Sequence, residues 1–264
     1  MNVHFVTIST DHTRAEYLIR TSKYFDVPLT CITPEEWLGP GPTKMVEMRK
    51  FVADKNDNDI IIFADAYDCL VSNNLESILE KFKEEDCGAL FSAEVNCYPD
   101  RYLHHWFDYF NHKGIVDTKN LFPNVGLYIG RVKNLKHFYN WKSDDEIFSY
   151  PEGDQDYFHD YYLSHANDEE VKLDIYSKVF QNIHQISWEE LEFKCGHLFN
   201  NVFETNPAFL HFSGGSFFLE PENPEINVLP DIADRILFFH QNKNLKGPFS
   251  HTTRLQRIQA RLQK

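Results

Sequence analysis

Short apolar runs alternate with longer amphipathic segments along the first hundred residues of the chain. Four runs are short and rich in β-branched and aromatic residues, as expected of strands: Val3–Ile8, Leu29–Ile32, Asp59–Ala64 and Ala89–Ala93. The segments between them repeat apolar residues at helical spacing: Arg14–Tyr24, Met45–Lys55 and Leu75–Phe82. This alternation predicts an α/β fold with a largely parallel central sheet flanked by helices.

A buried strand and a loop stand out within this half. Asp59–Ala64 is almost wholly apolar, which predicts a strand covered on both faces of the sheet. Gly39–Lys44 contains two Gly-Pro pairs in a row. We expect this segment to be a loop, because Gly and Pro interrupt helices and central strands.

The second half of the chain is less regular. We expect a strand at Gly126–Val132, a helix at Asp154–Ser164, a strand at Ala208–Phe212 and irregular structure at Pro221–Pro230. Residues 1–220 are thus predicted to form one domain and residues 221–264 an irregular C-terminal appendage. The end of that appendage has basic residues at helical spacing, which predicts an amphipathic helix whose basic face is solvated or meets an acidic partner or a membrane surface: Arg254, Arg257, Arg261 and Lys264.

Composition excludes several classes of protein. Of 264 residues, 42% are hydrophobic and 15% aromatic, which indicates a globular protein with a ring-rich core. The 26 basic and 40 acidic residues give a formal net charge of −14, so we expect no nucleic-acid partner. Every apolar run is far shorter than a membrane span. The five cysteines are scattered without a Cys-x-x-Cys pair, which argues against a disulfide framework or a structural zinc site.

The N-terminal residues bear on the location of the protein. The first residues contain no basic segment followed by a long apolar stretch, so we expect no signal peptide. Together with the cysteine pattern, this favours a soluble protein of the cytoplasm or of a viral factory over a secreted one. The oligomeric state stays open, with a homodimer as one option.

Two acidic side chains at the end of a predicted strand carry the sharpest chemical signal. Asp65 and Asp68 directly follow the buried apolar strand, and ligands of open α/β sheets lie at the carboxyl ends of strands. Two carboxylates there can hold a divalent cation that neutralises the departing diphosphate of a nucleotide sugar. A surface turn that caps the next helix explains the same spacing, and both explanations remain open.

Two later positions can complete such a site. His211 ends an apolar strand ahead of Ser213 and Gly214. An imidazole suits Mn²⁺ as a third ligand, and Ser and Gly let backbone N–H groups approach phosphate. Asp154 opens a predicted helix, where it can orient an acceptor hydroxyl or face positive charge at an anomeric carbon. Taken alone, His211 is also explained by a hydrogen-bonded core histidine, and Asp154 by a helix N-cap.

The order and spacing of several blocks resemble one known family. Over about residues 3–216 the chain resembles the glycosyltransferase domain of the procollagen lysyl hydroxylases, the multifunctional lysyl hydroxylase/glycosyltransferases. The blocks that carry the resemblance are Glu36-Trp37 with Lys44, Phe63 to Asp68, Phe91 to Glu94 with Cys97-Tyr98-Pro99, Asn124 to Gly130, Asp154-Gln155, Leu173-Asp174 with Val179 to Asn182, and Leu210-His211. The run Phe-Ser-Ala-Glu-x-x-Cys-aromatic-Pro is specific, and the blocks occur in the family's order.

The resemblance implies a GT-A-type fold, a UDP-sugar donor and Mn²⁺. It implies metal ligation by Asp65, Asp68 and His211. The positions that it implies for donor binding are Ile8, Ser9 and Thr10 around the uridine, Tyr67 on or beside the uracil, and Lys44 at the diphosphate. Those that it implies near the sugar and the acceptor are Glu94, Asn124 and Asp154.

The implied reaction moves a hexose, glucose before galactose, onto a hydroxylysine-linked galactose or a hydroxylysine of a collagen-like acceptor. The anomeric configuration is retained. Retention proceeds either by front-face substitution or through a carboxylate-linked intermediate, for which Asp154 or Glu94 is the candidate nucleophile.

The chain departs from the family pattern on the acceptor side. The family's run of aspartates is here Glu152-Gly153-Asp154, and an expected Trp is Tyr98. Phe-Ser-Gly-Gly follows His211 where the family has Gly-Asn-Gly-Pro. These changes leave the predicted metal and UDP positions intact. We expect a stand-alone transferase, without the hydroxylase domain, of the kind that a microbe or a large virus encodes.

Two other classes of function remain as alternatives. A non-catalytic module of the same fold would bind a nucleotide sugar or a collagen-like chain without turnover, and the acceptor-side departures favour it. A metal-dependent phosphohydrolase would also use two acids at a strand end. In that class one residue separates the two acids, whereas two residues separate Asp65 and Asp68.

Overall fold

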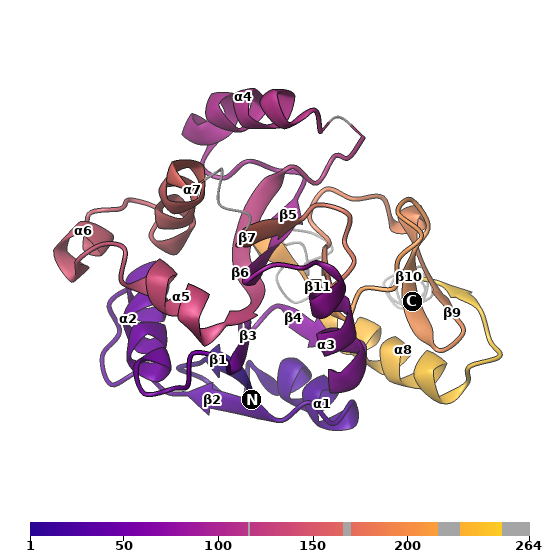
Figure 1. The fold of residues 1–264 in the computed structure, drawn as a ribbon. Helices are drawn as coiled ribbons and strands as arrows, with labels where there is room; N and C mark the ends of the chain where they lie inside the picture. Colours follow the sequence, from indigo (N-terminus) through magenta and orange to yellow (C-terminus); the bar gives the residue numbers. More distant parts are fainter. Residues whose placement is uncertain (116, 166–169, 216–227, 250–264) are drawn as a thin grey trace, which may run out of the picture.

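The computed structural model describes residues 1–115, 117–165, 170–215 and 228–249, and a six-stranded sheet forms its centre (Figure 1). The strand order is β2-β1-β3-β6-β5-β7. All neighbours are parallel except those that include β6. The bounds are β1 (Val3–Ile8), β2 (Leu29–Ile32), β3 (Ile60–Ala64), β5 (Ala89–Glu94), β6 (Phe122–Arg131) and β7 (Val171–Asp174). The predicted α/β fold with a mainly parallel sheet is confirmed.

Strand β3 separates two hydrophobic cores, and all five of its residues are buried. Ile60 and Ile62 face one core, and Ile61 and Phe63 face the other. The helices with buried residues in the first core are α1 (Glu16–Tyr24), α3 (Leu75–Glu84) and α8 (Leu229–Gln241). Those of the second are α2 (Pro40–Ala53), α4 (Leu103–Lys113), α5 (Val132–Tyr139), α6 (Asp144–Phe148) and α7 (Asp154–Ser164). Figure 1 shows α2, α5 and α7 on one side of the sheet and α1, α3 and α8 on the other.

The second core is rich in aromatic rings, as the composition predicts. The rings of Phe63 and Tyr128 stack with centroids 4.9 Å apart and an interplanar angle of 9°. Phe91 packs on Tyr128 at 5.0 Å and on Phe158 at 4.3 Å. These contacts join β3, β6, β5 and α7, so they fix α7 against the sheet.

The antiparallel strand β6 lies between two parallel strands and is longer than predicted. It pairs with β3 up to Ala64 opposite Leu127, and its register with β5 shifts between Phe91 and Ser92. Directly beyond β3, the backbone N–H of Asp65 donates to the carbonyl of Gly126 at 2.8 Å. The direction of β6 thus brings its first half to the carboxyl end of β3.

A small second sheet brings a late strand, β11, back to the same place. It consists of β4 (Cys69–Val71), β11 (Phe209–His211) and β8 (Phe180–Asn182), in the order β4-β11-β8. His211 lies opposite Cys69 in the antiparallel ladder. A third sheet has the order β10-β9-β12, formed by His197–Asn200, Leu191–Lys194 and Gly247–Pro248.

The predicted loop at Gly39–Lys44 is wrong. Helix α2 begins at Pro40 and has Gly39 as its N-cap residue, with a φ of 97°. The first four N–H groups of a helix have no intrahelical acceptor, so Pro40 and Pro42 remove no helical hydrogen bond there. The two Gly-Pro pairs therefore start a helix rather than interrupt one.

The C-terminal region contains a packed helix. Helix α8 begins at Leu229, so irregular structure was wrongly expected for Leu229 and Pro230; residues 221–227 lie outside the described residues. Ile232 and Ile236 of α8 are buried in the first core. The boundary at residue 220 and the basic helix at Arg254 to Lys264 also fall outside the described residues and stay predictions.

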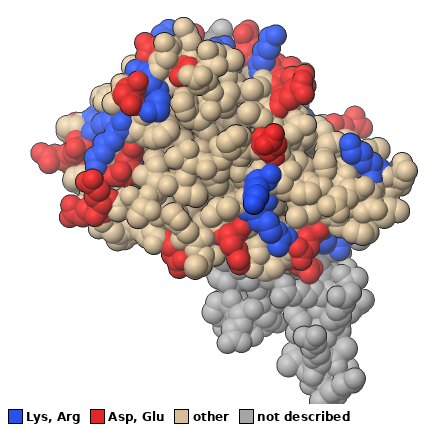
Figure 2. All heavy atoms as spheres, turned by 90° about the horizontal axis from the view of Figure 1, so that it is seen from below, with Lys and Arg blue, Asp and Glu red and all other residues tan. Residues whose placement is uncertain are grey.

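Charged side chains of both signs lie on the surface, and the cysteines are unpaired. On the face shown in Figure 2, described Lys and Arg side chains are interleaved with Asp and Glu. All five cysteines are free thiols. Among the described residues, every helix is too short or too polar to cross a bilayer.

Candidate metal and donor-binding site

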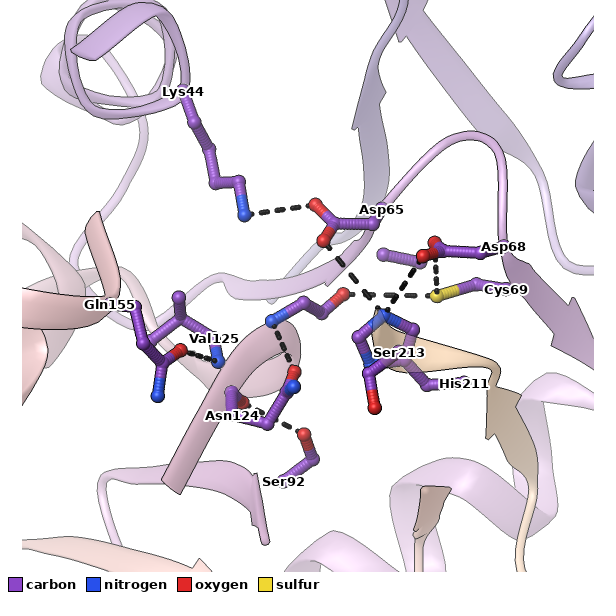
Figure 3. A network of polar contacts seen from close by, with 12 residues as sticks. Lys44, Asp65, Asp68, Cys69, Ser92, Asn124, Val125, Gln155, His211 and Ser213 are labelled. Carbon is purple, nitrogen blue, oxygen red and sulfur yellow. Dashed lines mark hydrogen bonds and ion pairs between the residues drawn. The ribbon is translucent and has the colours of Figure 1, made fainter. Parts of the chain in front are cut away.

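Three side chains from separate strand ends converge at the carboxyl end of β3 (Figure 3). The Nε2 atom of His211 lies 3.4 Å from Oδ2 of Asp68 and 4.0 Å from Oδ2 of Asp65. Asp65 follows β3, Asp68 precedes β4, and His211 ends β11. The structure thus brings together the three residues implied as metal ligands.

Gly126 makes this convergence sterically feasible. A β-carbon at Gly126 would lie 2.2 Å from Cε1 of His211 and 2.7 Å from Oδ2 of Asp65. In the sequence, Gly126 is marked only by its place in the block Asn124 to Gly130, and nothing there indicates its contact with His211.

Lys44, which the resemblance places at the diphosphate, forms ion pairs with two carboxylates. Its Nζ atom lies 2.9 Å from Oδ1 of Asp65 and 2.6 Å from Oδ2 of Asp154. The Lys44 and Asp154 side chains are only 13% and 12% exposed. The charged amine therefore links the predicted metal site to the predicted acceptor side.

The starts of α2 and α7 touch through two glycines, and this contact places Lys44 beside Asp154. A β-carbon at Gly41 would lie 2.5 Å from the backbone nitrogen of Asp154 and 2.6 Å from Cα of Gly153. Gly153 has φ 62° and ψ −126°, a conformation that essentially only glycine adopts. The residue that interrupts the family's acidic run is therefore required by the backbone here.

Tyr67 is anchored at the end of β1 through its hydroxyl. The phenol oxygen accepts from the backbone N–H groups of Thr10 at 3.0 Å and Asp11 at 3.1 Å. It also lies 3.0 Å from Oγ1 of Thr10 and 3.4 Å from Oγ of the buried Ser9. The residues implied for uridine binding are thus one connected group.

A cavity of about 390 Å³ opens beside these side chains. Six of the predicted site residues line it: Ile8, Lys44, Asp65, Tyr67, Asp68 and Asp154. Arg14 and Trp37 line it as well. The guanidinium carbon of Arg14 lies 4.4 Å from the centroid of the Tyr67 ring. In the sequence, Arg14 is marked only by its place at the start of a predicted helix, which indicates no function.

Glu94, Asn124 and Ser213 form a buried network that lies outside the cavity lining. The carboxylate of Glu94 accepts from Nδ2 of Asn124 at 2.8 Å and from Oγ of Ser213 at 3.2 Å. Oδ1 of Asn124 accepts from the backbone N–H of Gly126 at 2.8 Å. The network therefore fixes the part of β6 that contacts Asp65 and His211. Gly214 is exposed, and a β-carbon there would lie 3.2 Å from Nδ1 of His184.

Burial and the neighbouring charges shift several pKa values at the site. Burial raises the pKa of Asp65, and the ammonium of Lys44 opposes that rise. Burial disfavours the charged form of Lys44, but Asp154 and Asp65 outweigh it and raise the pKa of Lys44. Burial also raises the pKa of Glu94. Lys44 is thus a permanent cation among carboxylates at neutral pH.

The donor atoms present fit a divalent cation. Asp68, Cys69 and His211 each offer a ligand atom within 4.8 Å of the others, and Asp65 lies at the edge of this group. Nδ1 of His211 is buried without a hydrogen-bond partner in the described part of the chain. Burial raises the pKa of Cys69 well above its ordinary value, so Cys69 is a neutral thiol in the metal-free protein, and Mn²⁺ prefers oxygen and imidazole ligands to a thiol. Two carboxylates and an imidazole form the donor set, and it suits Mn²⁺ and similar ions.

The arrangement of sheets and helices defines a structural class: the protein has the GT-A fold of glycosyltransferases. The crystal structure of a glycosyltransferase involved in the glycosylation of the major capsid of PBCV-1 has the same fold. It superposes with a TM-score of 0.51 at 8% sequence identity, and covers 90% of this chain and 100% of that chain.

Sequence comparison gives the family. A family model described as the PLOD GT domain matches residues 1–219, so the chain belongs to this family. The chain is 32% identical over 212 residues to the procollagen-lysine,2-oxoglutarate 5-dioxygenase of Drosophila melanogaster, covering 74% of this chain and 28% of that protein. It is 28% identical over 230 residues to the multifunctional procollagen lysine hydroxylase and glycosyltransferase of Caenorhabditis elegans, covering 80% and 30%. The chain spans less than a third of either relative.

Proposed function

We propose that the protein is a Mn²⁺-dependent, retaining hexosyltransferase that uses a UDP-sugar, with UDP-glucose favoured over UDP-galactose. The acceptor is a hydroxylysine-linked galactose, or hydroxylysine, in a collagen-like chain. The observation that carries the proposal is the convergence of Asp65, Asp68 and His211 beside a cavity that Tyr67 lines. The family and the fold support the transferase chemistry.

Asp65, Asp68 and His211 would hold the cation. When bound, the cation supplies positive charge that stabilises the departing diphosphate. Tyr67 would position the uracil, since its hydroxyl is fixed at the end of β1 by Thr10 and Asp11. The donor would then lie with its nucleoside toward β1 and its diphosphate toward the ends of β3 and β11.

Lys44 and Asp154 would act at the reacting end of the donor. Lys44 holds Asp154 at 2.6 Å and keeps this carboxylate next to Asp65. Asp154 can then face the positive charge that develops at the anomeric carbon or orient the acceptor hydroxyl. Glu94 has both carboxylate oxygens occupied by Asn124 and Ser213, so its contacts favour a positioning role over nucleophilic attack.

A donor panel tests the proposal. The purified chain is incubated with Mn²⁺ and UDP-glucose, UDP-galactose or another UDP-sugar, and UDP release is measured with and without a galactosyl-hydroxylysine peptide. We expect release that requires both Mn²⁺ and the peptide and is fastest with UDP-glucose. UDP binding without release for any donor or acceptor would instead support the non-catalytic module. Hydrolysis of p-nitrophenyl phosphate would support the phosphohydrolase.

A further inference from the structure

The described lining of the cavity includes one guanidinium group, that of Arg14, which has no part in the proposed function so far. Arg14 precedes α1 and is exposed at the cavity rim. Its guanidinium carbon lies 4.4 Å from the centroid of the Tyr67 ring, so a cation–π contact holds the guanidinium over this ring. Tyr67 directly precedes Asp68 in the sequence. The group is thus placed by Tyr67 and not by a carboxylate.

The charge of Arg14 is available to a ligand. Arg14 forms no salt bridge with a carboxylate in the part of the chain that the structure describes. The nearby Asp11 is engaged by Thr13, whose backbone N–H and hydroxyl both donate to Oδ1 of Asp11, at 2.9 and 2.6 Å. These hydrogen bonds are the main reason that the pKa of Asp11 is lowered, and the charge of Arg14 contributes less.

When a nucleotide is bound, its negative charge calls for a further positive group in the cavity. Asp65, Asp68 and Asp154 line it, and the amine of Lys44 already pairs with two of these carboxylates. A nucleoside diphosphate adds at least two further negative charges. A divalent cation at the proposed metal site and Lys44 together offset the three carboxylates, and Arg14 is the one other cationic side chain of the described cavity lining that can add positive charge opposite the diphosphate.

We propose that Arg14 is a donor-binding residue that contacts the phosphate groups of the nucleoside diphosphate. A planar guanidinium matches two phosphate oxygens at once, whereas the neutral uracil and ribose offer no charge to pair with it. Arg14 therefore contributes to the affinity for the donor and for released UDP. This inference rests on the proposed function.

Binding measurements on Arg14→Gln and Arg14→Lys test the assignment. Calorimetric titrations use uridine, UMP, UDP and UDP-glucose in the presence of Mn²⁺. Because hydrogen bonds between charged groups are strong, we expect Arg14→Gln to weaken UDP binding roughly ten- to a hundredfold, with a flatter salt dependence and unchanged uridine binding. Arg14→Lys keeps the charge but lacks the planar guanidinium that contacts two oxygens. Its affinity for UDP should lie between those of the wild type and Arg14→Gln. In turnover, KM for the donor should rise.

Arg20→Gln is the matched control. Arg20 lies in α1, pairs with Asp234 of α8, and is 42% exposed. Its substitution should leave nucleotide affinity unchanged. Arg14 is exposed, so the Gln variant should fold, which its thermal melting curve checks.

The possible results separate the two proposals. Equal UDP affinity of the wild type and Arg14→Gln would overturn the role of Arg14 and leave the proposed function standing. An equal loss of uridine affinity would overturn the phosphate contact. A wild-type protein that binds neither UDP nor UDP-glucose with Mn²⁺ would overturn the proposed function itself.

Discussion

Gly126 and His211 are so close that no other residue fits at position 126 without moving the imidazole. A β-carbon there would lie 2.2 Å from Cε1 of His211, and 2.7 Å from Oδ2 of Asp65. Gly126 belongs to β6, the antiparallel strand that lies between β3 and β5. The topology of the sheet and the spacing of the proposed ligands are thus linked at one backbone position.

Gly126→Ala should therefore separate Asp65 from His211. We expect Mn²⁺ affinity to fall at least roughly tenfold, as when groups that orient metal ligands are changed. Overpacking should also reduce the free energy of unfolding by about 1–3 kcal/mol. Calorimetry with Mn²⁺ and UDP, together with urea unfolding, measures both effects.

Gly130→Ala is the control on the same strand. A β-carbon at Gly130 would lie 2.9 Å from Cβ of Ala89, away from the metal residues. This variant should lose stability and keep its Mn²⁺ affinity. Equal Mn²⁺ affinity in both variants would contradict the role given to Gly126.

Gly153→Ala should disturb the junction of α2 and α7. The new β-carbon would lie 2.9 Å from Cα of Gly41, and the backbone of Gly153 is strained for any other residue. We expect a loss of about 1–3 kcal/mol in unfolding free energy. The rate of UDP release should fall as well, because the first residue of α7, Asp154, moves away from Lys44. Thermal melting and a UDP-release assay check the two effects.

Gly114→Ala separates backbone strain from the loss of contact. Gly114 has a φ of 70°, and a β-carbon there would meet no atom within 4 Å. The control should lose stability without slowing UDP release. If both variants slow release equally, the Gly41–Gly153 contact does not position Asp154.

The sequence predicts the strands β1, β2, β3 and β5 closely, for a physical reason. Short and almost wholly apolar runs such as Asp59–Ala64 are typical of strands in a sheet that is covered on both faces. Acids at the end of such a run then lie at the ligand-binding edge. Neither step depends on long-range pairing, so the strand β3 and the position of Asp65 could both be predicted.

The contacts between distant residues could not be predicted from local patterns. The Gly-Pro pairs at Gly39–Lys44 are loop signals unless a helix begins at that position, and the sequence alone does not show where it begins. The ion pairs of Lys44 depend on the contact of Gly41 with Gly153, which are more than a hundred residues apart. The same holds for Gly126, whose importance arises only because β11 returns to β4.

Lys44 and Asp154 should show a large energetic coupling. Lys44→Met leaves two largely buried carboxylates without a counter-charge, and we expect a loss of about 2–3 kcal/mol in unfolding free energy. A double-mutant cycle with Asp154→Asn should give a coupling of about 1–2 kcal/mol in urea unfolding.

The pair Lys50–Glu47 on the same helix is the matched control for this cycle. Lys50 is 57% exposed, and such surface pairs contribute little to stability. Its coupling should not exceed about 0.5 kcal/mol. A Lys44–Asp154 coupling of the same small size would show that the pair is not a structural link.

His159 should make the protein less stable as the pH falls. The ring is fully buried, accepts from Nε1 of Trp106 at 2.5 Å and lies 2.9 Å from the carbonyl of Tyr98, so it is neutral with its proton on Nε2. Burial lowers the pKa of His159 to about 4. The unfolded chain binds this proton near pH 6.5, so the stabilisation is complete above that pH and is lost between about 6.5 and 4, by about 3 kcal/mol.

A comparison with His159→Gln isolates this effect. Glutamine retains one donor and one acceptor but does not titrate. The difference in unfolding free energy between the two proteins should shrink between pH 7 and pH 4.5. His104→Gln on the exposed face of α4 should leave the pH profile unchanged. Parallel pH profiles for the wild type and His159→Gln would contradict a buried neutral imidazole.

The central claim is that Asp65, Asp68 and His211 together bind the cation that holds the diphosphate. Electron paramagnetic resonance of Mn²⁺, titrated with and without UDP, measures this directly. The wild type should bind one Mn²⁺ per chain, more tightly with UDP, and Asp65→Asn and His211→Gln should each weaken binding at least roughly tenfold. Cys69→Val should bind like the wild type, because Mn²⁺ prefers carboxylate and imidazole ligands to a thiol. Unchanged Mn²⁺ affinity in Asp65→Asn and His211→Gln, or its loss in Cys69→Val alone, would contradict the account.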